Sequence, residues 1–325
     1  MGVQVSTIRA RTAVTRAVGA GVGPVGRSVG NFLRLALATT AGRIGLSIVA
    51  VHLTLALIGP WLAPYSPTEL HLSPDYPEEH RLSPPTSLYW LGTDQFGRDL
   101  LSRMMSGARS LITVAVAGAA LGIALGTVVG MSSGYKGGRV DEVVMRVMDG
   151  LMSFPSLLLA LLVLTTLGSR AAPVEWLEQL WQELLIVATI GIVFMPGVSR
   201  VMRGVTLSLK EMEFVQSARL RGEQAGYIIF REILPNAVPV LVVEASVRLS
   251  YSILLVSSLG FLGLGVQPPS SDWGMMIGDS RNFLVAAPWL ALIPSAAIAS
   301  LVVGVNLLGD GLRQARGLPQ EGEGL

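Results

Sequence analysis

The 325-residue sequence contains no cysteine, three histidines and few charged side chains. The absence of cysteine excludes disulfide bonds and thiol chemistry, and His52, His71 and His80 do not have the spacing of metal ligands. Charged residues make up 14% of the chain, whereas an average soluble domain carries about 25%. The composition therefore argues against an ordinary soluble domain, and we predict no metal site.

The motifs of nucleotide hydrolysis and covalent catalysis are also missing. Residues 134–139 contain glycines and a lysine, but neither in the order of a phosphate-binding loop nor after a strand, so we interpret them as a cytoplasmic turn. No nucleophile motif and no zinc-protease helix is present. We predict that the chain is not an enzyme, so energy for any directed process must come from another subunit or an ion gradient.

Long uncharged runs are what the sequence does contain. Hydrophobic residues make up 51% of the chain, and the mean hydropathy is +0.57. Several runs exceed the roughly 18 residues that indicate a membrane-spanning helix. The pattern predicts an all-α polytopic membrane protein with six transmembrane helices, near 44–62, 111–132, 148–168, 184–203, 239–264 and 287–308.

The distribution of positive charge predicts how these helices are oriented. With the N-terminus inside, the inner segments hold 17 of the 24 Lys and Arg residues, and cytoplasmic loops are the ones enriched in Lys and Arg. Both termini are therefore expected in the cytoplasm. The predicted organisation is a basic cytoplasmic leader (1–43), a first transmembrane helix (44–62), an extracytoplasmic segment (63–110), a core domain with five transmembrane helices (111–312) that includes a cytoplasmic loop near 206–235, and a cytoplasmic tail (313–325).

Glycines recur every four residues in the second predicted span, at Gly118, Gly122, Gly126 and Gly130. Residues four apart share one face of a helix, and a face without side chains lets another helix approach closely. We interpret these glycines as a helix-packing face, with a pore-lining role as the alternative.

Ionisable and kink-forming residues inside the spans are candidates for a pore or a gate. Glu244 and Arg248 lie one helical turn apart and form either a structural ion pair or a contact with solute, because charge is costly in lipid. Prolines kink helices, which suits a gated path, although proline is also ordinary in membrane helices. The pore or gate candidates are Phe154, Pro155, Met195, Pro196, Glu244 and Arg248.

The segment 213–235 is a charged, helix-forming stretch between two apolar spans. It resembles the cytoplasmic coupling loop of ABC-importer permeases, in which Glu-Ala-Ala is followed by Gly and then by Leu-Pro. Residues 216–218, Gly222 and 234–235 lie at the family spacing. The sequence departs from the motif at Gln216, where the family has Glu, and at Ser217, where it has Ala.

Further segments match the same family in order over roughly residues 45–315. They are 91–103, 134–141, 154–155, 260–269, 272–274, 288–289 and 306–313. Together they resemble the C-type permease subunit of dipeptide, oligopeptide and nickel ABC importers.

The resemblance implies a type I ABC importer permease fold in the prokaryotic inner membrane. It also implies a homologous permease partner, two cytoplasmic ATPases that carry ATP and magnesium, and an extracytoplasmic solute-binding protein. The lipid bilayer surrounds the chain, with no nucleic acid partner and no cofactor bound by the chain itself. The ATPase-coupling residues would be Glu213, Gln216, Ser217, Ala218, Arg219, Leu220, Arg221, Gly222, Tyr227 and Pro235.

On this basis we expect import of dipeptides or oligopeptides, driven by ATP closure that moves the coupling helix and tilts the kinked spans. Arg219 and Arg221 would face the ATPase or the lipid headgroups. Import of nickel or another small solute is the alternative. A gradient-driven transporter, which needs carboxylates near mid-membrane, and a membrane scaffold are the two other hypotheses.

Overall fold

The computed structural model describes residues 28–70, 80–168, 178–267 and 270–315. The described residues are mainly helical, so the predicted all-α class is confirmed. The helices are α2 (Ser28–Ala38), α3 (Thr40–Leu62), α4 (Leu100–Lys136), α5 (Gly138–Met152), α6 (Ser156–Gly168), α7 (Glu178–Leu209), α8 (Glu213–Leu220), α9 (Ala225–Tyr227), the π-helix η3 (Ile228–Ile233), α10 (Leu234–Phe261), α11 (Trp273–Ser280), the short 3-10 helix η4 (Arg281–Phe283) and α12 (Trp289–Ala315).

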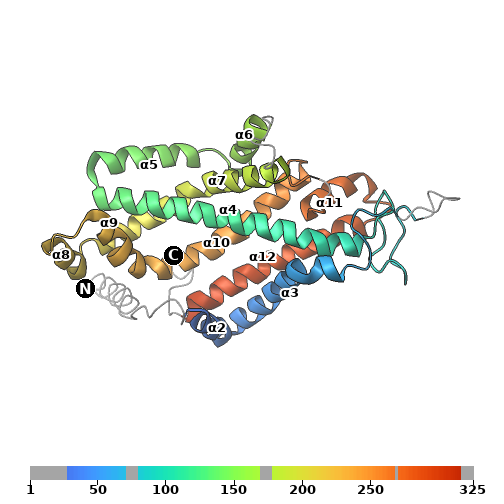
Figure 1. Ribbon diagram of the computed structural model, residues 1–325, viewed down its shortest axis with the longest axis horizontal. Coiled ribbons are helices and arrows are strands. Elements are labelled where there is room, and N and C mark those ends of the chain that lie inside the picture. The colour runs from blue at the N-terminus through green and yellow to red at the C-terminus, as the bar shows by residue number, and fades with distance from the viewer. Residues whose placement is uncertain (1–27, 71–79, 169–177, 268–269, 316–325) are drawn as a thin grey trace, which may run out of the picture.

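Five long helices, α3, α4, α7, α10 and α12, run roughly along the longest axis of the molecule (Figure 1). Among the described residues, these five are long and apolar enough to cross a membrane. Helix α4 alone has 37 residues, or roughly 56 Å at 1.5 Å per residue. Because the hydrocarbon core is only about 30 Å thick, α4 extends well beyond the membrane.

The span expected near 148–168 is not one continuous helix. Helices α5 and α6 meet at a bend of 91°, and Pro155 lies in the break between them. Proline has no N–H to donate, which explains why the helix is interrupted here. With 13 residues, α6 measures only about 20 Å, so the pair makes a sixth span only as a broken one.

Helix α4 begins at Leu100, well before the expected start at 111. The Asp99 carboxylate caps it by accepting a hydrogen bond of 2.8 Å from the Ser102 N–H. Arg103 is buried near the start of α4 and pairs with Asp94. Because Asp94 neutralises it, the arginine fits inside the protein rather than at the membrane surface.

The glycine face of α4 packs directly against α7, and the two helices lie side by side (Figure 1). A Cβ atom added at Gly118 would lie 2.8 Å from the Ile190 side chain, and one at Gly130 would lie 2.2 Å from the Ser199 carbonyl oxygen. Side chains at these positions would force the helices apart. The glycines therefore permit a close backbone approach along this face.

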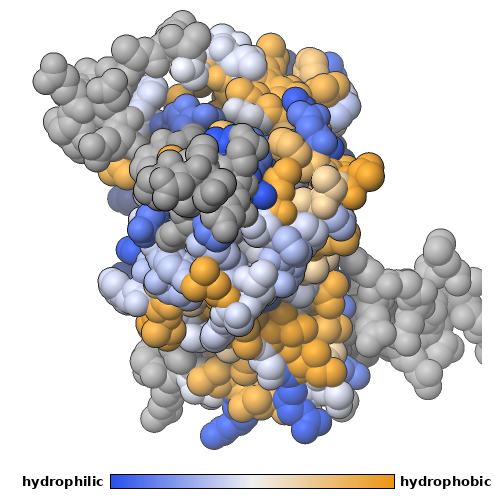
Figure 2. Space-filling model, turned by 90° about the vertical axis from the view of Figure 1, so that its right-hand side faces the viewer, coloured by the Kyte–Doolittle hydropathy of each residue, from blue (hydrophilic) through white to orange (hydrophobic). Residues whose placement is uncertain are grey.

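The two ends of the bundle differ. Helices α8 and α9 lie at one end of the longest axis, and the start of α3 and the end of α12 point towards that end, whereas α11 and residues 80–99 lie at the other (Figure 1). Figure 2 faces the α11 end, where hydrophilic and weakly polar residues cover much of the centre and hydrophobic residues flank them. This pattern suits an end in water with sides in lipid.

Candidate functional site

The loop between α7 and α10 folds into a compact tip of the bundle. Helix α8 is amphipathic, and its Val215 and Ala218 are fully buried in an apolar cluster with Ile228 and Ile233 of the π-helix η3. Two apolar residues three apart lie on one face of a helix, so burying this face fixes the rotation of α8 about its axis. Helix α8 is therefore held by the start of the long α10 segment that follows it.

Gly222 ends α8 in a left-handed turn. Its φ is +78°, its N–H donates to the Arg219 carbonyl at 2.9 Å, and the Glu223 N–H donates to the Ala218 carbonyl at 3.2 Å. This pair of hydrogen bonds is the Schellman ending of a helix, which favours glycine. Space is not the reason, because a Cβ at Gly222 would have nothing within 4 Å.

The face of α8 opposite the buried cluster is exposed and partly apolar. The Leu220 side chain is 89% exposed, and Glu213, Gln216 and Ser217 are exposed beside it. Tyr227, after the turn, is also exposed. Leu220 is thus a large apolar side chain that α8 leaves exposed beside polar residues.

The two arginines of this tip bond to the chain itself. The Arg221 Nη2 donates to Glu232 Oε1 at 3.2 Å, and the Arg219 guanidinium lies 5.2 Å from the centre of the Tyr135 ring. Both arginines are also exposed, so their orientation towards an ATPase or the headgroups stays a prediction. Their intrachain partners connect α8 to η3 and to the end of α4.

Further polar contacts connect α7 to α4 and α5 near the same end. The Arg203 Nε and Nη2 each donate to a different oxygen of Asp141 at 2.6 Å, and Lys210 Nζ donates to the Gly134 carbonyl oxygen at 3.2 Å. The sequence analysis missed these contacts because their partners are more than 60 residues apart. Bidentate Arg–carboxylate pairs are among the strongest polar contacts, so α5 and α7 are firmly joined.

Pro235 follows the π-helix η3 and lies in the first turn of α10. Proline is tolerated there because the first N–H groups of a helix have no intrahelical partner. Single turns of π-helix frequently occur at functional sites. Tyr227 ends α9 immediately before η3, the segment that packs against α8, and Pro235 follows η3 at the start of α10.

The pore or gate candidates lie on three different parts of the bundle. Phe154 and Pro155 are at the break before α6, and both are exposed. Met195 and Pro196 lie inside α7, with Pro196 buried. Glu244 and Arg248 form the expected ion pair on α10, with Nε donating to Oε1 at 2.6 Å.

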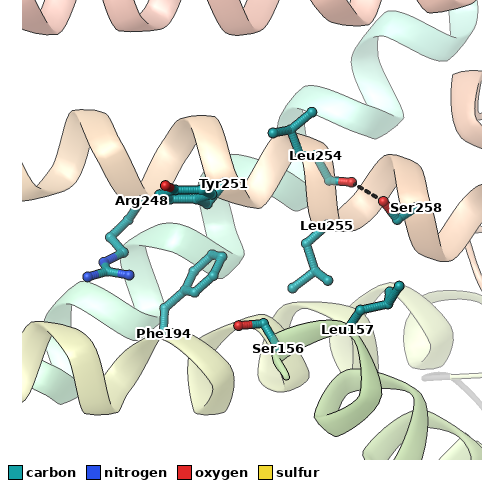
Figure 3. A pocket seen from close by; sticks show the side chains of 8 residues that line it. All are labelled: Ser156, Leu157, Phe194, Arg248, Tyr251, Leu254, Leu255 and Ser258. Atoms are coloured by element: carbon teal, nitrogen blue, oxygen red, sulfur yellow. Dashed lines mark hydrogen bonds between the residues drawn. The ribbon is translucent and has the colours of Figure 1, made fainter. Parts of the chain in front are cut away.

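A cavity of about 290 Å³ lies where α6, α7 and α10 meet (Figure 3). Its lining includes Phe194 of α7 and Arg248, Tyr251 and Leu255 of α10. The cavity brings Arg248 together with residues that the sequence analysis did not select. The helical spacing of positions 244, 248, 251, 255 and 258 could have indicated a shared face of α10.

Comparison with known proteins identifies the kind of chain to which this geometry belongs. A family model described as "Binding-protein-dependent transport system inner membrane component" matches residues 122–315, which include α5 to α12. The chain belongs to this family. The predicted C-type permease character and type I importer permease fold are thereby confirmed.

The chain is also similar over most of its length to individual members. It is 38% identical over 285 residues to "Glutathione transport system permease protein GsiD" of Pectobacterium atrosepticum, covering 87% of each chain. It is 38% identical over 275 residues to "Dipeptide transport system permease protein DppC" of Alkalihalophilus pseudofirmus, covering 84% of each. It is 36% identical over 266 residues to "Probable D,D-dipeptide transport system permease protein DdpC" of Escherichia coli, covering 82% of this chain and 83% of that one.

Membership of this family makes the chain a multi-pass permease of the inner membrane and a transport component rather than an enzyme. It decides against a gradient-driven transporter or a scaffold. ABC systems of this kind work with ATPases and binding proteins, and ATP and magnesium belong to the ATPases in the family generally.

Proposed function

We propose that this permease moves dipeptides or other short peptides through the inner membrane. The proposed substrate class rests on the extended similarity of the chain to permeases whose names specify dipeptide, D,D-dipeptide and glutathione transport. Glutathione is itself a short peptide, so the three names share one chemistry. A solute-binding protein outside the membrane delivers the peptide.

The permease acts as one half of a pair. In this proposal a homologous permease completes the path, and two ATPases beneath them bind ATP and magnesium, whereas this chain binds neither. The regions predicted from the sequence keep their roles: a cytoplasmic leader (1–43), a first span (44–62), an extracytoplasmic segment (63–110), a core permease domain (111–312) and a cytoplasmic tail (313–325).

Helix α8 is the contact with an ATPase. Its exposed face offers Gln216, Ser217 and the protruding Leu220, and its buried face packs on the segment that leads into α10. Gln216 carries no charge, so docking relies on apolar contact and hydrogen bonds rather than on a salt bridge at this position. Closure of the ATPases displaces α8, and the contacts of Arg219 and Arg221 transmit the movement to α4 and η3.

The α8 end of the bundle is the cytoplasmic end. Supporting this, the excess of Lys and Arg lies in the segments assigned to that side. The first residues of α3 and the last of α12 are the ends of those helices that point towards the α8 end (Figure 1). Both termini are therefore cytoplasmic in this proposal, and α11 faces the binding protein.

Uptake into proteoliposomes tests the proposed function. The permease would be reconstituted with its partner permease, ATPases and binding protein, and supplied with a labelled dipeptide or with radioactive nickel. We expect accumulation of the dipeptide that requires ATP and the binding protein. Accumulation of nickel alone, or uptake without ATP, would contradict the proposal.

A further inference from the structure

Arg248 places a positive charge in the wall of the cavity between α6, α7 and α10 (Figure 3). It lies near the middle of α10, 14 residues after Leu234 and 13 before Phe261. Because an arginine is costly within a membrane span, such a residue points to a functional contact. Arg248 therefore needs an explanation beyond helix packing.

The ion pair with Glu244 leaves part of the guanidinium group unused. Both Nε and Nη2 approach the same oxygen, Glu244 Oε1, at 2.6 and 2.5 Å. Arg203 and Asp141 in the same chain instead make one contact to each carboxylate oxygen. Arg248 Nη1 has no hydrogen-bond partner among the described residues, so the guanidinium has donors left for a second acceptor.

The surroundings of Arg248 keep its guanidinium group accessible. It lies beside Gly197 of α7, where an added Cβ would be 2.7 Å from Nη2, and 5.9 Å from the centre of the Phe194 ring. A larger residue at position 197 would collide with the guanidinium. Glu244 and Phe194 therefore orient the charge while the cavity remains open beside it.

The size and lining of the cavity fit one end of a short peptide. Its volume of about 290 Å³ is near the lower limit of small-molecule sites, which are mostly apolar with a few polar groups. Leu254 and Leu255 supply apolar wall, and the hydroxyls of Ser156 and Tyr251 add hydrogen-bonding groups (Figure 3). The free charged donor in this wall matches a carboxylate.

We propose that Arg248 binds the terminal carboxylate of a peptide in transit, with Glu244 holding the guanidinium in place. This inference rests on the proposed peptide transport and adds a substrate contact within the permease itself. The Arg248–Glu244 pair is neutral, so a zwitterionic peptide enters without adding net charge to the membrane interior. Arg248 is thus a specificity residue, selecting peptides with a free carboxylate.

The test compares a labelled dipeptide with its C-terminal amide in the reconstituted transporter. The main variant is Glu244→Gln combined with Arg248→Gln, which leaves neither charge unpaired, and Arg248→Lys is the conservative variant. The same binding protein serves every variant, so any change in the ratio of acid to amide uptake arises in the permease. Saturating binding protein keeps delivery constant.

We expect the double variant to lower uptake of the free acid about tenfold, the effect of losing one charged hydrogen bond, and to lower amide uptake much less. Arg248→Lys should lower acid uptake less, because it keeps the charge without the planar fork. An equal fall for both substrates, or an unchanged ratio, would overturn the carboxylate site. Failure of the unmodified transporter to import either form would instead refute peptide transport.

Thiol protection provides a second test that leaves Arg248 intact. The chain has no cysteine, so Leu254→Cys introduces a unique thiol in the cavity wall, and a maleimide reagent reports its accessibility by a mobility shift of this chain. We expect the free-acid dipeptide to slow labelling and the amide to do so far less. Equal protection by both, or by neither, would contradict the proposal.

Discussion

Gly222 and Asp272 show how single residues determine local properties of this permease. Gly222 adopts a positive φ that ends α8 and directs the chain back towards α10. Asp272 caps α11 through Oδ1, which accepts a hydrogen bond of 3.0 Å from the Met275 N–H, while Oδ2 has no partner among the described residues. Gly222 therefore sets the direction of the backbone after α8, and Asp272 places an ionisable carboxyl in the protein interior.

Gly222→Ala should weaken ATP-driven uptake. A left-handed conformation costs a non-glycine residue about 1–2 kcal/mol, so alanine favours a different ending for α8 and misplaces its exposed face. Peptide uptake and ATPase activity are measured together, because a loss of coupling lowers uptake relative to ATP hydrolysis. Gly226→Ala is the matched control, because Gly226 lies four residues further on in open space without a positive φ. Equal uptake by the two variants would show that the turn is not needed.

Burial raises the pKa of the Asp272 carboxyl from 3.8 to about 6, although the backbone N–H groups of Met275 and Gly274 oppose the change. A carboxyl whose pKa is higher in the folded state stabilises the protein fully below the unfolded value of 3.8. That contribution is lost as the pH rises through about 6. The buried charge is therefore least favourable at neutral and alkaline pH.

Asp272→Asn should remove a pH dependence of stability. Between pH 5 and pH 8 we expect Asp272 to cost the folded state about 1 kcal/mol, while asparagine retains an oxygen for the cap. Thermal unfolding of the purified permease in detergent at both pH values measures the difference. Asp310→Asn, an exposed acid on α12, should leave the pH dependence as it is. Identical pH profiles for the native protein and Asp272→Asn would contradict the assignment.

At the scale of the elements, the close contact of α4 with α7 forms much of the scaffold. Gly126 and Gly130 face Val198 and Ser199 at distances that leave no room for a methyl group. Within a membrane, helix association depends on such close packing because lipid is as apolar as the side chains.

Gly130→Ala should destabilise the permease by about 1–3 kcal/mol, the usual cost of overpacking an interior. Its Cβ would lie 2.2 Å from the Ser199 carbonyl oxygen, a backbone atom that moves only with its helix. Thermal unfolding in detergent measures this, and we expect a lower midpoint for Gly130→Ala. Gly150→Ala on α5, with nothing within 4 Å, should be neutral. A midpoint unaffected by Gly130→Ala would mean that the helices separate at little cost.

Hydrophobic runs predicted the five long helices well, because a bilayer requires long apolar segments whatever their neighbours. The predicted membrane span begins at residue 111, whereas α4 begins at Leu100 and includes the buried Arg103. Its burial depends on Asp94, and that contact forms only in the folded protein. Pro155 predicted a kink, but a proline does not determine its size, which is 91° between α5 and α6.

The candidate site was predictable in part. The spacing of Gln216, Gly222 and Pro235 predicted a coupling loop between two spans, and α8, α9 and η3 lie between the long helices α7 and α10. The coupling role itself stays a prediction. The partners of Arg219 and Arg221 were not predictable, since Tyr135 and Glu232 reach them only through the fold. The cavity around Arg248 likewise needs three helices brought together.

At the scale of the whole molecule, α8 and the Arg248 cavity are parts of one continuous structure. Helix α8 packs on η3, η3 leads directly into α10, and α10 carries Glu244 and Arg248. We propose that a displacement of α8 is transmitted along α10 to the cavity. In this proposal an ATPase acts on the exposed face of α8, and α10 transmits the action to the transport path.

Crosslinking from α8 tests this claim most directly. Gln216→Cys places a single thiol on the exposed face in a chain without cysteine, and Leu88→Cys provides an exposed control in the segment near α11, at the other end. With the assembled transporter and a short bifunctional reagent, we predict an adduct between Gln216→Cys and an ATPase whose yield changes on ATP binding, and none from Leu88→Cys. The absence of an ATPase adduct from Gln216→Cys and from single cysteines at the neighbouring exposed positions 217 and 220, with the ATPases present, would contradict the account.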